Sequence, residues 1–245
     1  MDHALTATGL LNVWERGRSQ TPVERALALL AWADADTPPE AWARKNIGQR
    51  DAWLLRLREK LFGPRLTGQA QCPGCRRWVE LDFPVAELRN APAPEATANF
   101  TRQCGDFEVQ FRLPNSEDLL TLSAGGELAS QCRQLVTRCV TQVRRGETVL
   151  PADGLADEVI QELSAQMTEL DPQGDVELVL TCPDCDQRWQ APLDIVAFLW
   201  SEIQAWAERL LREVHGLASA YGWREADILA MSASRRQAYL ELIGQ

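Results

Sequence analysis

Histidine is scarce in this chain of 245 residues, which contains only His3 and His215. A catalytic zinc site needs three protein ligands, and histidine is usually among them. The histidine count alone therefore nearly excludes a zinc hydrolase. His215 follows Arg212 and Glu213 closely in the sequence, and these neighbours are more typical of a hydrogen-bonding residue on a helix than of a proton carrier.

Motifs for phosphate binding, the motif of a nucleophilic serine and apolar runs for membrane insertion are all missing. The sequence contains no G-x-x-x-x-G-K-[ST], G-x-G-x-x-G or G-x-S-x-G, and Gly125-Gly126 is typical of an isolated turn. No stretch approaches the roughly 18 apolar residues of a membrane span. The first ten residues combine neither a basic flank nor a long apolar segment. We expect a cytoplasmic protein without membrane insertion, catalytic residues or a small-molecule substrate.

Positive charge is also in short supply, with 25 basic against 35 acidic residues and a net charge of -10. Proteins that bind a phosphate backbone usually present a basic face, so the net charge argues against nucleic acid as a partner of the chain as a whole. A local patch stays possible through arginines of the middle and the C-terminal part. These are Arg133, Arg138, Arg144, Arg145, Arg235 and Arg236. A zinc-ribbon regulator that binds nucleic acid is therefore the alternative hypothesis.

The composition that is present, 45% apolar and 24% charged, is ordinary for a soluble globular protein. Apolar residues recur at helical spacing towards both ends of the chain and alternate beside two cysteine pairs. These patterns predict an α+β fold that is mainly α-helical. We expect an N-terminal helical bundle (1–63), a first zinc-knuckle hairpin (64–90), an inserted acidic, mainly helical lobe (91–174), a second zinc-knuckle hairpin (175–192) and a C-terminal helical region (193–245).

The cysteines carry the strongest signal in the sequence. Four of the seven lie in two C-P-x-C pairs, Cys72 with Cys75 and Cys182 with Cys185. Two cysteines at this spacing across a tight turn direct both sulfurs at one metal, and two such knuckles complete a tetrahedral site. We predict one structural Zn²⁺ held by these four residues. The alternatives are two redox C-x-x-C motifs or a degenerate site that has lost its metal.

A site of four thiolates is closed, because it leaves no coordination position for water or substrate. The predicted zinc therefore holds structure rather than performing chemistry. The segments CPGCRRWVELDFPVAEL and CPDCDQRWQAPLDIVAFL also repeat each other when one residue is inserted before the shared Arg-Trp of the second. This repeat predicts that the metal joins the two halves of a split ribbon.

The other cysteines and the tryptophans are interpreted mainly as core residues. The segment ELASQCRQLVTRCVTQV predicts a helix whose apolar stripe is Leu128, Cys132, Leu135, Cys139 and Val143. Cys104 stands before Gly105 at a predicted hairpin turn, as a free thiol or a spare for the metal site. Nine tryptophans are numerous, and core is the first interpretation for each. Any excess beyond the needs of the core suits protein interfaces.

A resemblance extends over much of the chain. The knuckle at Cys182 and the segments DIVAFLW, Glu213 to His215, Tyr221 to Trp223 and Arg235-Arg236 resemble the baseplate proteins of T-even-like contractile-tail phages and of phage-tail-like injection systems. The N-terminal segments LLNVWERGRSQTPVERALALLAWA and QRDAWLLRLREKLFGPRL are also similar to the injection-system members.

The resemblance implies a non-enzymatic role in building the baseplate or its hub, as a built-in subunit or as an assembly chaperone. The implied partners are other baseplate, hub or spike proteins, and a built-in subunit would be incorporated into the particle. The residues add two expectations of their own. Tyr221 to Trp223 should end a helix sharply, and Arg235-Arg236 should offer a contact for a carboxylate of a partner.

Overall fold

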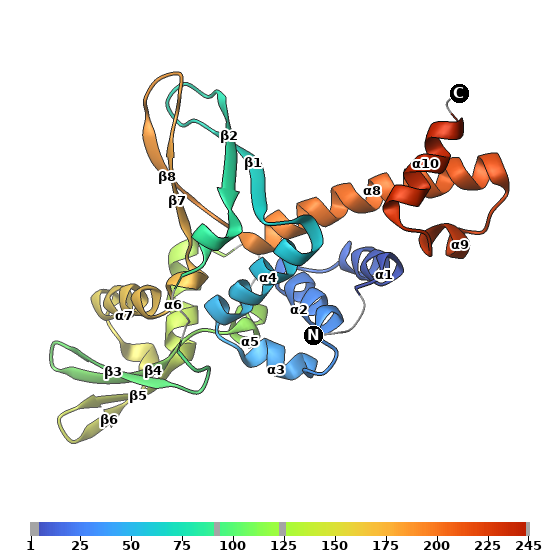
Figure 1. Cartoon of the computed structure of the whole chain (residues 1–245). Helices are drawn as coiled ribbons and strands as arrows, with labels where there is room; N and C mark the ends of the chain where they lie inside the picture. Colours follow the sequence, from blue (N-terminus) through green and yellow to red (C-terminus); the bar gives the residue numbers. More distant parts are fainter. Residues whose placement is uncertain (1–4, 91–93, 123–125, 244–245) are drawn as a thin grey trace. The chain divides into compact units, whose positions relative to one another are not determined.

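A computed structural model describes residues 5–90, 94–122 and 126–243. It is α+β and mainly helical, as predicted, with small antiparallel sheets between its helices (Figure 1). The chain forms two compact units, one made of residues 1–36 with 196–245 and the other of residues 37–195. Within the described residues, no helix is both long and apolar enough to cross a membrane.

The first unit is built on helices α1 (Ala7–Gly17), α2 (Pro22–Ala33) and α8 (Ile195–Tyr221), the last of which lies in this unit from Val196 onward. Thr21 and Glu24 form a capping box at the start of α2, as the sequence predicts. The Trp14 indole donates to Gln204 Oε1 at 2.7 Å, and Arg25 stacks on Trp200 at 4.5 Å from the ring centre. These contacts join α1 and α2 to α8.

The C-terminal end of α8 is covered by α9 (Glu225–Leu229) and α10 (Ala233–Ile243), which fold back beside it (Figure 1). The helix ends at Tyr221, and Gly222 adopts the left-handed φ of 68° that the predicted sharp stop requires. Arg236 is buried and binds Glu213 at 2.9 Å and the Met231 carbonyl at 2.7 Å. The expectation that it offers a contact to a partner is therefore wrong, because its guanidinium is used within the chain.

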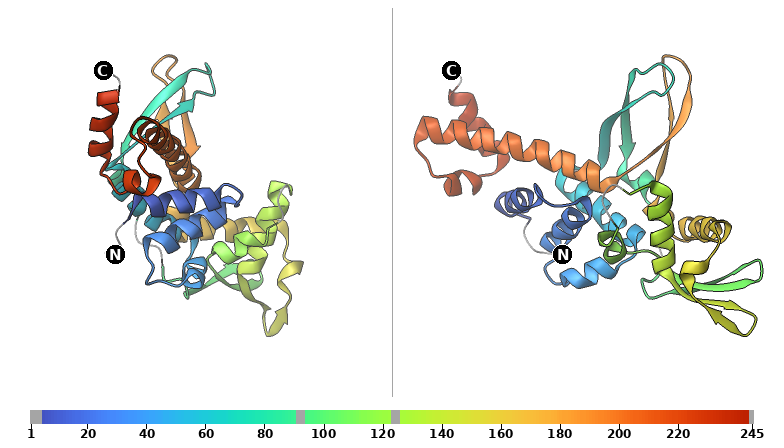
Figure 2. Two further views of the ribbon diagram at one scale, coloured as in Figure 1. Left: turned by 90° about the vertical axis from the view of Figure 1, so that its right-hand side faces the viewer. Right: turned by 180° about the vertical axis from the view of Figure 1, so that it is seen from behind.

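The second unit begins with α3 (Pro39–Arg44) and α4 (Ile47–Phe62), followed by the hairpin of β1 (Arg65–Gln71) and β2 (Trp78–Pro84) and the short helix η1 (Val85–Leu88). A matching hairpin of β7 (Glu177–Thr181) and β8 (Arg188–Pro192) comes near its end. Each hairpin is a two-stranded antiparallel sheet of its own. The two hairpins stand side by side with their tips together (Figures 1 and 2).

Between the hairpins the chain forms an antiparallel sheet of order β3-β4-β5-β6 with helices packed against it. Its strands are Asn99–Cys104, Phe107–Arg112, Val140–Arg145 and Thr148–Leu150. The helices of this region are α5 (Ser116–Leu120), α6 (Leu128–Cys139) and α7 (Asp157–Leu170), with the short helices η2 (Ala152–Gly154) and η3 (Pro172–Gly174). The core of this region includes Val109, Phe111, Val143 and Leu163.

The helix predicted through Val143 is too long. It ends at Cys139, and Val140 begins β5, because Val-Thr-Gln-Val alternates and leads into a hairpin turn at Gly146. The predicted apolar stripe is also wrong at its first member, since Leu128 is 81% exposed. Cys139 is fully buried, as expected, whereas Cys132 is only half-buried.

Candidate metal centre

The four predicted cysteines converge at the tips of the two hairpins. Cys72 and Cys75 lie between β1 and β2, and Cys182 and Cys185 lie between β7 and β8. All four sulfurs lie within 4.8 Å of one another. Across the hairpins, Cys72 Sγ is 3.7 Å from Cys185 Sγ, and Cys75 Sγ is 3.6 Å from Cys182 Sγ. The structure therefore brings the whole predicted set together.

These sulfur separations fit a tetrahedral metal site. A zinc–sulfur bond of about 2.3 Å with tetrahedral angles places two sulfurs about 3.8 Å apart. A disulfide would require about 2.05 Å. The donor set is therefore suited to one thiophilic ion at the centre of the cluster, where Cys72 and Cys182 are fully buried and Cys75 and Cys185 form its exposed side.

The two knuckles have the same backbone hydrogen bonds. Cys72 N–H donates to Arg77 O at 2.9 Å, and Arg76 N–H donates to Cys72 O at 2.9 Å. The second knuckle has the same pair of bonds at equivalent positions: Cys182 N–H donates to Gln187 O at 2.9 Å, and Asp186 N–H donates to Cys182 O at 3.0 Å. Arg76 and Asp186 both adopt a left-handed φ, of 61° and 56°. Both knuckles are thus six-residue turns with identical geometry.

Equal turn lengths correct the sequence alignment of the repeat. Trp78 pairs with Gln71, directly beside its turn, and the residue at the same position in the second hairpin is Arg188, which pairs with Thr181. Trp189 is equivalent to Val79 instead. No residue is inserted, and the shared Arg-Trp is displaced by one position. Because side chains alternate between the faces of a strand, the two tryptophans point to opposite faces.

The burial of the tryptophans follows this register. Trp189 and Val79 pack with Cys72, Cys182 and Leu81 in a small cluster between the hairpins. Trp78 instead is 65% exposed, so the interpretation of this tryptophan as a core residue is wrong. The sequence signal that identifies it is the spacing from the second cysteine of each knuckle, three residues to Trp78 and four to Trp189.

Backbone N–H groups of the knuckles stabilise the thiolate form of some cysteines, whereas neighbouring sulfurs disfavour a second thiolate beside the first. The N–H groups of Cys75 and Gly74 lower the pKa of Cys72 to about 7. The Gln187 N–H favours the thiolate of Cys185, yet the neighbouring sulfurs of Cys75, Cys72 and Cys182 together with burial raise the pKa of Cys185 to about 12. Four thiolates this close together need a cation to offset their charge. A bound metal ion supplies that positive charge, and its binding releases the thiol protons.

Contacts at the base of the hairpins hold them together independently of the cysteines. Asp171 Oδ2 accepts from the Gly48 N–H of α4 at 2.8 Å. Gln173 in η3 donates to Leu88 O at 3.2 Å and accepts from Asn90 N–H at 2.7 Å. η3 precedes the second hairpin, and Leu88 and Asn90 follow the first. The hairpins are therefore tied at their bases as well as at their tips.

The remaining candidates lie away from this centre. Cys104, the last residue of β3, is buried in the core that also contains Val109 and Leu163. It is not a member of the four-cysteine group. His215 is exposed on α8. His3 and Gly125 lie outside the described residues.

The arginines proposed as a nucleic-acid patch are largely paired with acids. Arg133 binds Asp157, Arg138 lies 3.5 Å from Asp118, and Arg145 binds Asp106 at 3.0 Å. These pairs reduce the positive charge available to a phosphate backbone.

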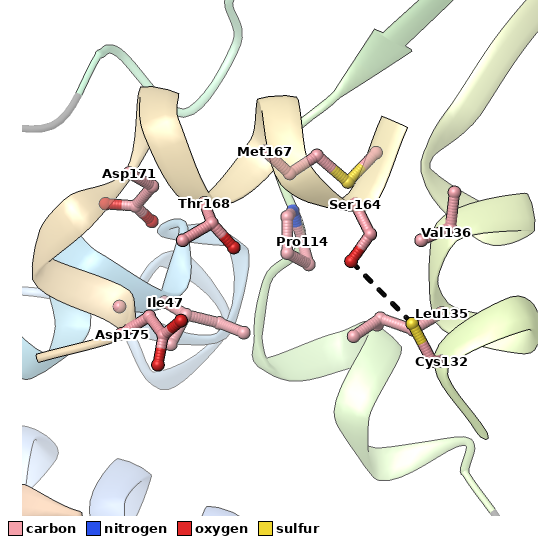
Figure 3. Close-up of a pocket in the computed structure, with 11 residues that line it drawn as sticks. Ile47, Pro114, Cys132, Leu135, Val136, Ser164, Met167, Thr168, Asp171 and Asp175 are labelled. Atoms are coloured by element: carbon pink, nitrogen blue, oxygen red, sulfur yellow. Dashed lines mark hydrogen bonds between the residues drawn. The ribbon is translucent and has the colours of Figure 1, made fainter. Parts of the chain in front are cut away.

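A cavity of about 130 Å³ lies between α6, α7 and the start of α4 (Figure 3). Its walls are mainly apolar, and Cys132 Sγ lies 3.7 Å from Ser164 Oγ at one side. No lining residue is a histidine or lysine that could activate this thiol. Pockets for small molecules usually measure about 300–1,000 Å³. The cavity is therefore smaller than a typical small-molecule site.

Comparison with known proteins identifies a family. A family model described as T4 bacteriophage base plate protein matches residues 37–200. No curated protein and no solved structure matches the chain significantly. The matched residues include both cysteine pairs and the segment DIVAFLW, whereas the resembling segments from Glu213 onward lie beyond them.

Proposed function

Because the chain belongs to the T4 bacteriophage base plate protein family, we propose that it is a non-enzymatic, zinc-containing component of the baseplate or a chaperone that assembles its hub. The particle is a phage-like contractile tail or injection system. Its partners are other baseplate, hub or spike proteins, and it acts by protein–protein contacts. It meets them in the cytoplasm and either stays in the particle or leaves it.

The observation that carries the proposal is the location of the cysteine cluster within the family match. The compact unit of residues 37–195 corresponds almost completely to the matched residues 37–200, and it contains all four sulfurs. The candidate functional site of this unit is therefore a closed set of four thiolates. Such a set supports the role of a structural element rather than an enzyme.

Zinc is the metal that this donor set suits best. Zn²⁺ favours four tetrahedral thiolates in structural sites and needs no further ligand. Bound there, it would supply a cross-link between residues 107 positions apart in the chain. Cys72, Cys75, Cys182 and Cys185 would hold it, and their hairpins would then form one rigid ribbon for other proteins to contact.

The test of the function is deletion of the gene in its native host, followed by complementation. We expect sheath and tube proteins to be made at normal levels while particles fail to assemble, as seen by electron microscopy of purified particles. The wild-type gene should restore assembly. Normal particles in the deletion strain would refute the proposal.

Purified particles also separate the two forms of the proposal. A component should be detected in finished particles by mass spectrometry at a fixed ratio to the sheath protein. A chaperone should be needed for assembly yet missing from the product.

A further inference from the structure

The first hairpin has an outward face that contributes nothing to the core. It consists of Thr67, Gln69 and Gln71 on β1 and their register partners Asp82, Glu80 and Trp78 on β2. All six side chains are exposed, whereas the alternate residues of both strands face the second hairpin or are partly buried. We call these six residues the outer face.

Trp78 is the unusual member of the outer face. It is 65% exposed, although the inward position beside it is already filled by Val79. The equivalent residue of the second hairpin is the polar Arg188. Nothing in the packing of the ribbon therefore requires an aromatic residue here. Tryptophan is enriched among the residues that contribute most of the binding energy of protein interfaces.

The polar groups around Trp78 are arranged for a cationic donor. Glu80 lies two residues along the same strand face, and its carboxylate makes no ion pair within the described residues. Asp82 is already paired with Arg65 at 2.7 Å. The Gln71 amide donates to Arg76 O at 3.0 Å, which leaves its carbonyl oxygen as an acceptor.

The face is also hollowed beside these groups. A shallow hollow of about 510 Å³ is lined by residues of both strands, including Gln69, Glu80 and the glycine at position 68. Glycine in the middle of a strand often marks a place where another chain approaches closely. The hollow thus continues the contact surface from Trp78 along the hairpin.

We propose that the outer face binds an arginine side chain in an extended segment of a partner protein. The guanidinium stacks on the Trp78 ring and pairs with Glu80, and the amide oxygens of Gln71 and Gln69 accept its remaining N–H groups. This inference rests on the proposed function, because it assumes a protein partner. The Glu80 carboxylate on the face disfavours an acidic segment or a nucleic acid. The exposed cation nearest in sequence, Arg76, belongs to the knuckle turn and not to the outer face.

The test uses the zinc-loaded full chain and the peptide acetyl-Thr-Val-Arg-Val-Thr-amide. The readout is the Trp78 indole N–H resonance, identified by its loss in Trp78→Phe. We expect the arginine peptide to shift this resonance at a dissociation constant about tenfold lower than peptides with alanine or glutamate at the centre. By the same readout, Glu80→Gln should weaken binding about tenfold or abolish it. Trp78→Ala lacks the indole, so its binding is measured by isothermal titration calorimetry beside the wild type, and we expect a similar loss.

The second hairpin supplies the matched control. Val179 is 59% exposed on its outward face, and Val179→Ala should leave peptide binding unchanged. Unaltered zinc content and far-ultraviolet circular dichroism of each variant verify the fold. These measurements do not depend on particle assembly, so their failure is distinguishable from a failure of the proposed function.

Three results would overturn the inference. One is equal or tighter binding of the glutamate peptide, and another is no saturable shift with any peptide up to millimolar concentration. The third is self-association of the wild-type chain in sedimentation equilibrium that Trp78→Ala abolishes, since the outer face would then bind a second copy.

Discussion

Replacement of Cys182 by serine tests the metal centre most directly. Cys182 is fully buried, and its sulfur is 3.6 Å from that of Cys75. A hydroxyl is a poor substitute for a thiolate, so the variant should bind less than about one tenth of the zinc that the wild type retains after dialysis. The measurement is the zinc content per chain by plasma mass spectrometry.

The expected loss of stability follows from the length of chain that the metal closes. A cross-link between residues 107 positions apart restricts the unfolded chain by about 5 kcal/mol in the loop-entropy estimate. The contacts at the base of the hairpins stay in place, so we expect a loss of about 4 kcal/mol. For a chain of this size that is a fall of about 10 °C in the melting temperature of the second unit, measured by calorimetry.

Two controls make this result specific. Cys132→Ser alters a half-buried thiol beside Ser164 and should leave the zinc content unchanged. A chelator should lower the melting temperature of the wild type to that of Cys182→Ser and have little effect on the variant. If Cys182→Ser retained one zinc per chain and an unchanged melting temperature, the assignment of the metal centre would be wrong.

Three further substitutions test the fold around the site. Asp118→Ala should cost about 3–5 kcal/mol in urea unfolding, because it leaves the Arg112 guanidinium without the buried carboxylate that it binds twice at 2.7 Å. Burial opposes ionisation of Asp118, but Arg112 holds the pKa of this carboxyl below its usual value. The stability difference between wild type and Asp118→Asn should therefore be constant above about pH 5, and it should shrink as the pH falls below about 4, where the carboxyl of the unfolded chain becomes protonated. A constant difference down to about pH 2 would contradict the pairing. Gly48→Ala should destabilise by about 1–3 kcal/mol, although alanine normally favours a helix, because its Cβ would lie 1.8 Å from Asp171 Oδ1; a stabilised variant would show that the contact is not tight. Arg76→Gly should stabilise the zinc-loaded chain by about 1 kcal/mol, because glycine adopts the φ of 61° without strain, and the zinc content should not change. A loss of stability would indicate that the arginine side chain contributes more than its backbone strain costs.

Local signals in the sequence predicted the parts of the structure that depend on local chemistry. The cysteine spacing located the knuckles, the capping box located the start of α2 at Thr21, and Gly222 located the end of α8. Each of these features is determined by a few adjacent residues. The mainly helical α+β class was predictable for the same reason.

Features that depend on pairing or packing were harder to predict. Val140 continues a helical pattern, and its N–H still donates to the Val136 and Thr137 carbonyls. It nevertheless begins a strand, because it pairs with Phe111 of β4, a partner that is distant in the sequence. The face of Trp78 depends on a register that is fixed only when the length of the knuckle turn is known. The base contacts of Asp171 and Gln173 join segments far apart in the sequence and have no local signature.

The two kinds of contact around the ribbon have different tasks. A two-stranded hairpin is at best marginally stable on its own, and the apolar cluster between these hairpins is small, with Cys72, Val79 and Cys182 as its buried members. The base contacts bring the hairpins together, but they cannot fix tips that lie several residues away. A metal ion at the tips would do so, and it would also make the outer face rigid. If the ribbon is a contact surface, the metal serves function by lowering the entropy that a partner must otherwise overcome on binding. Zinc removal should therefore weaken arginine-peptide binding at the outer face even though no residue of that face is a metal ligand.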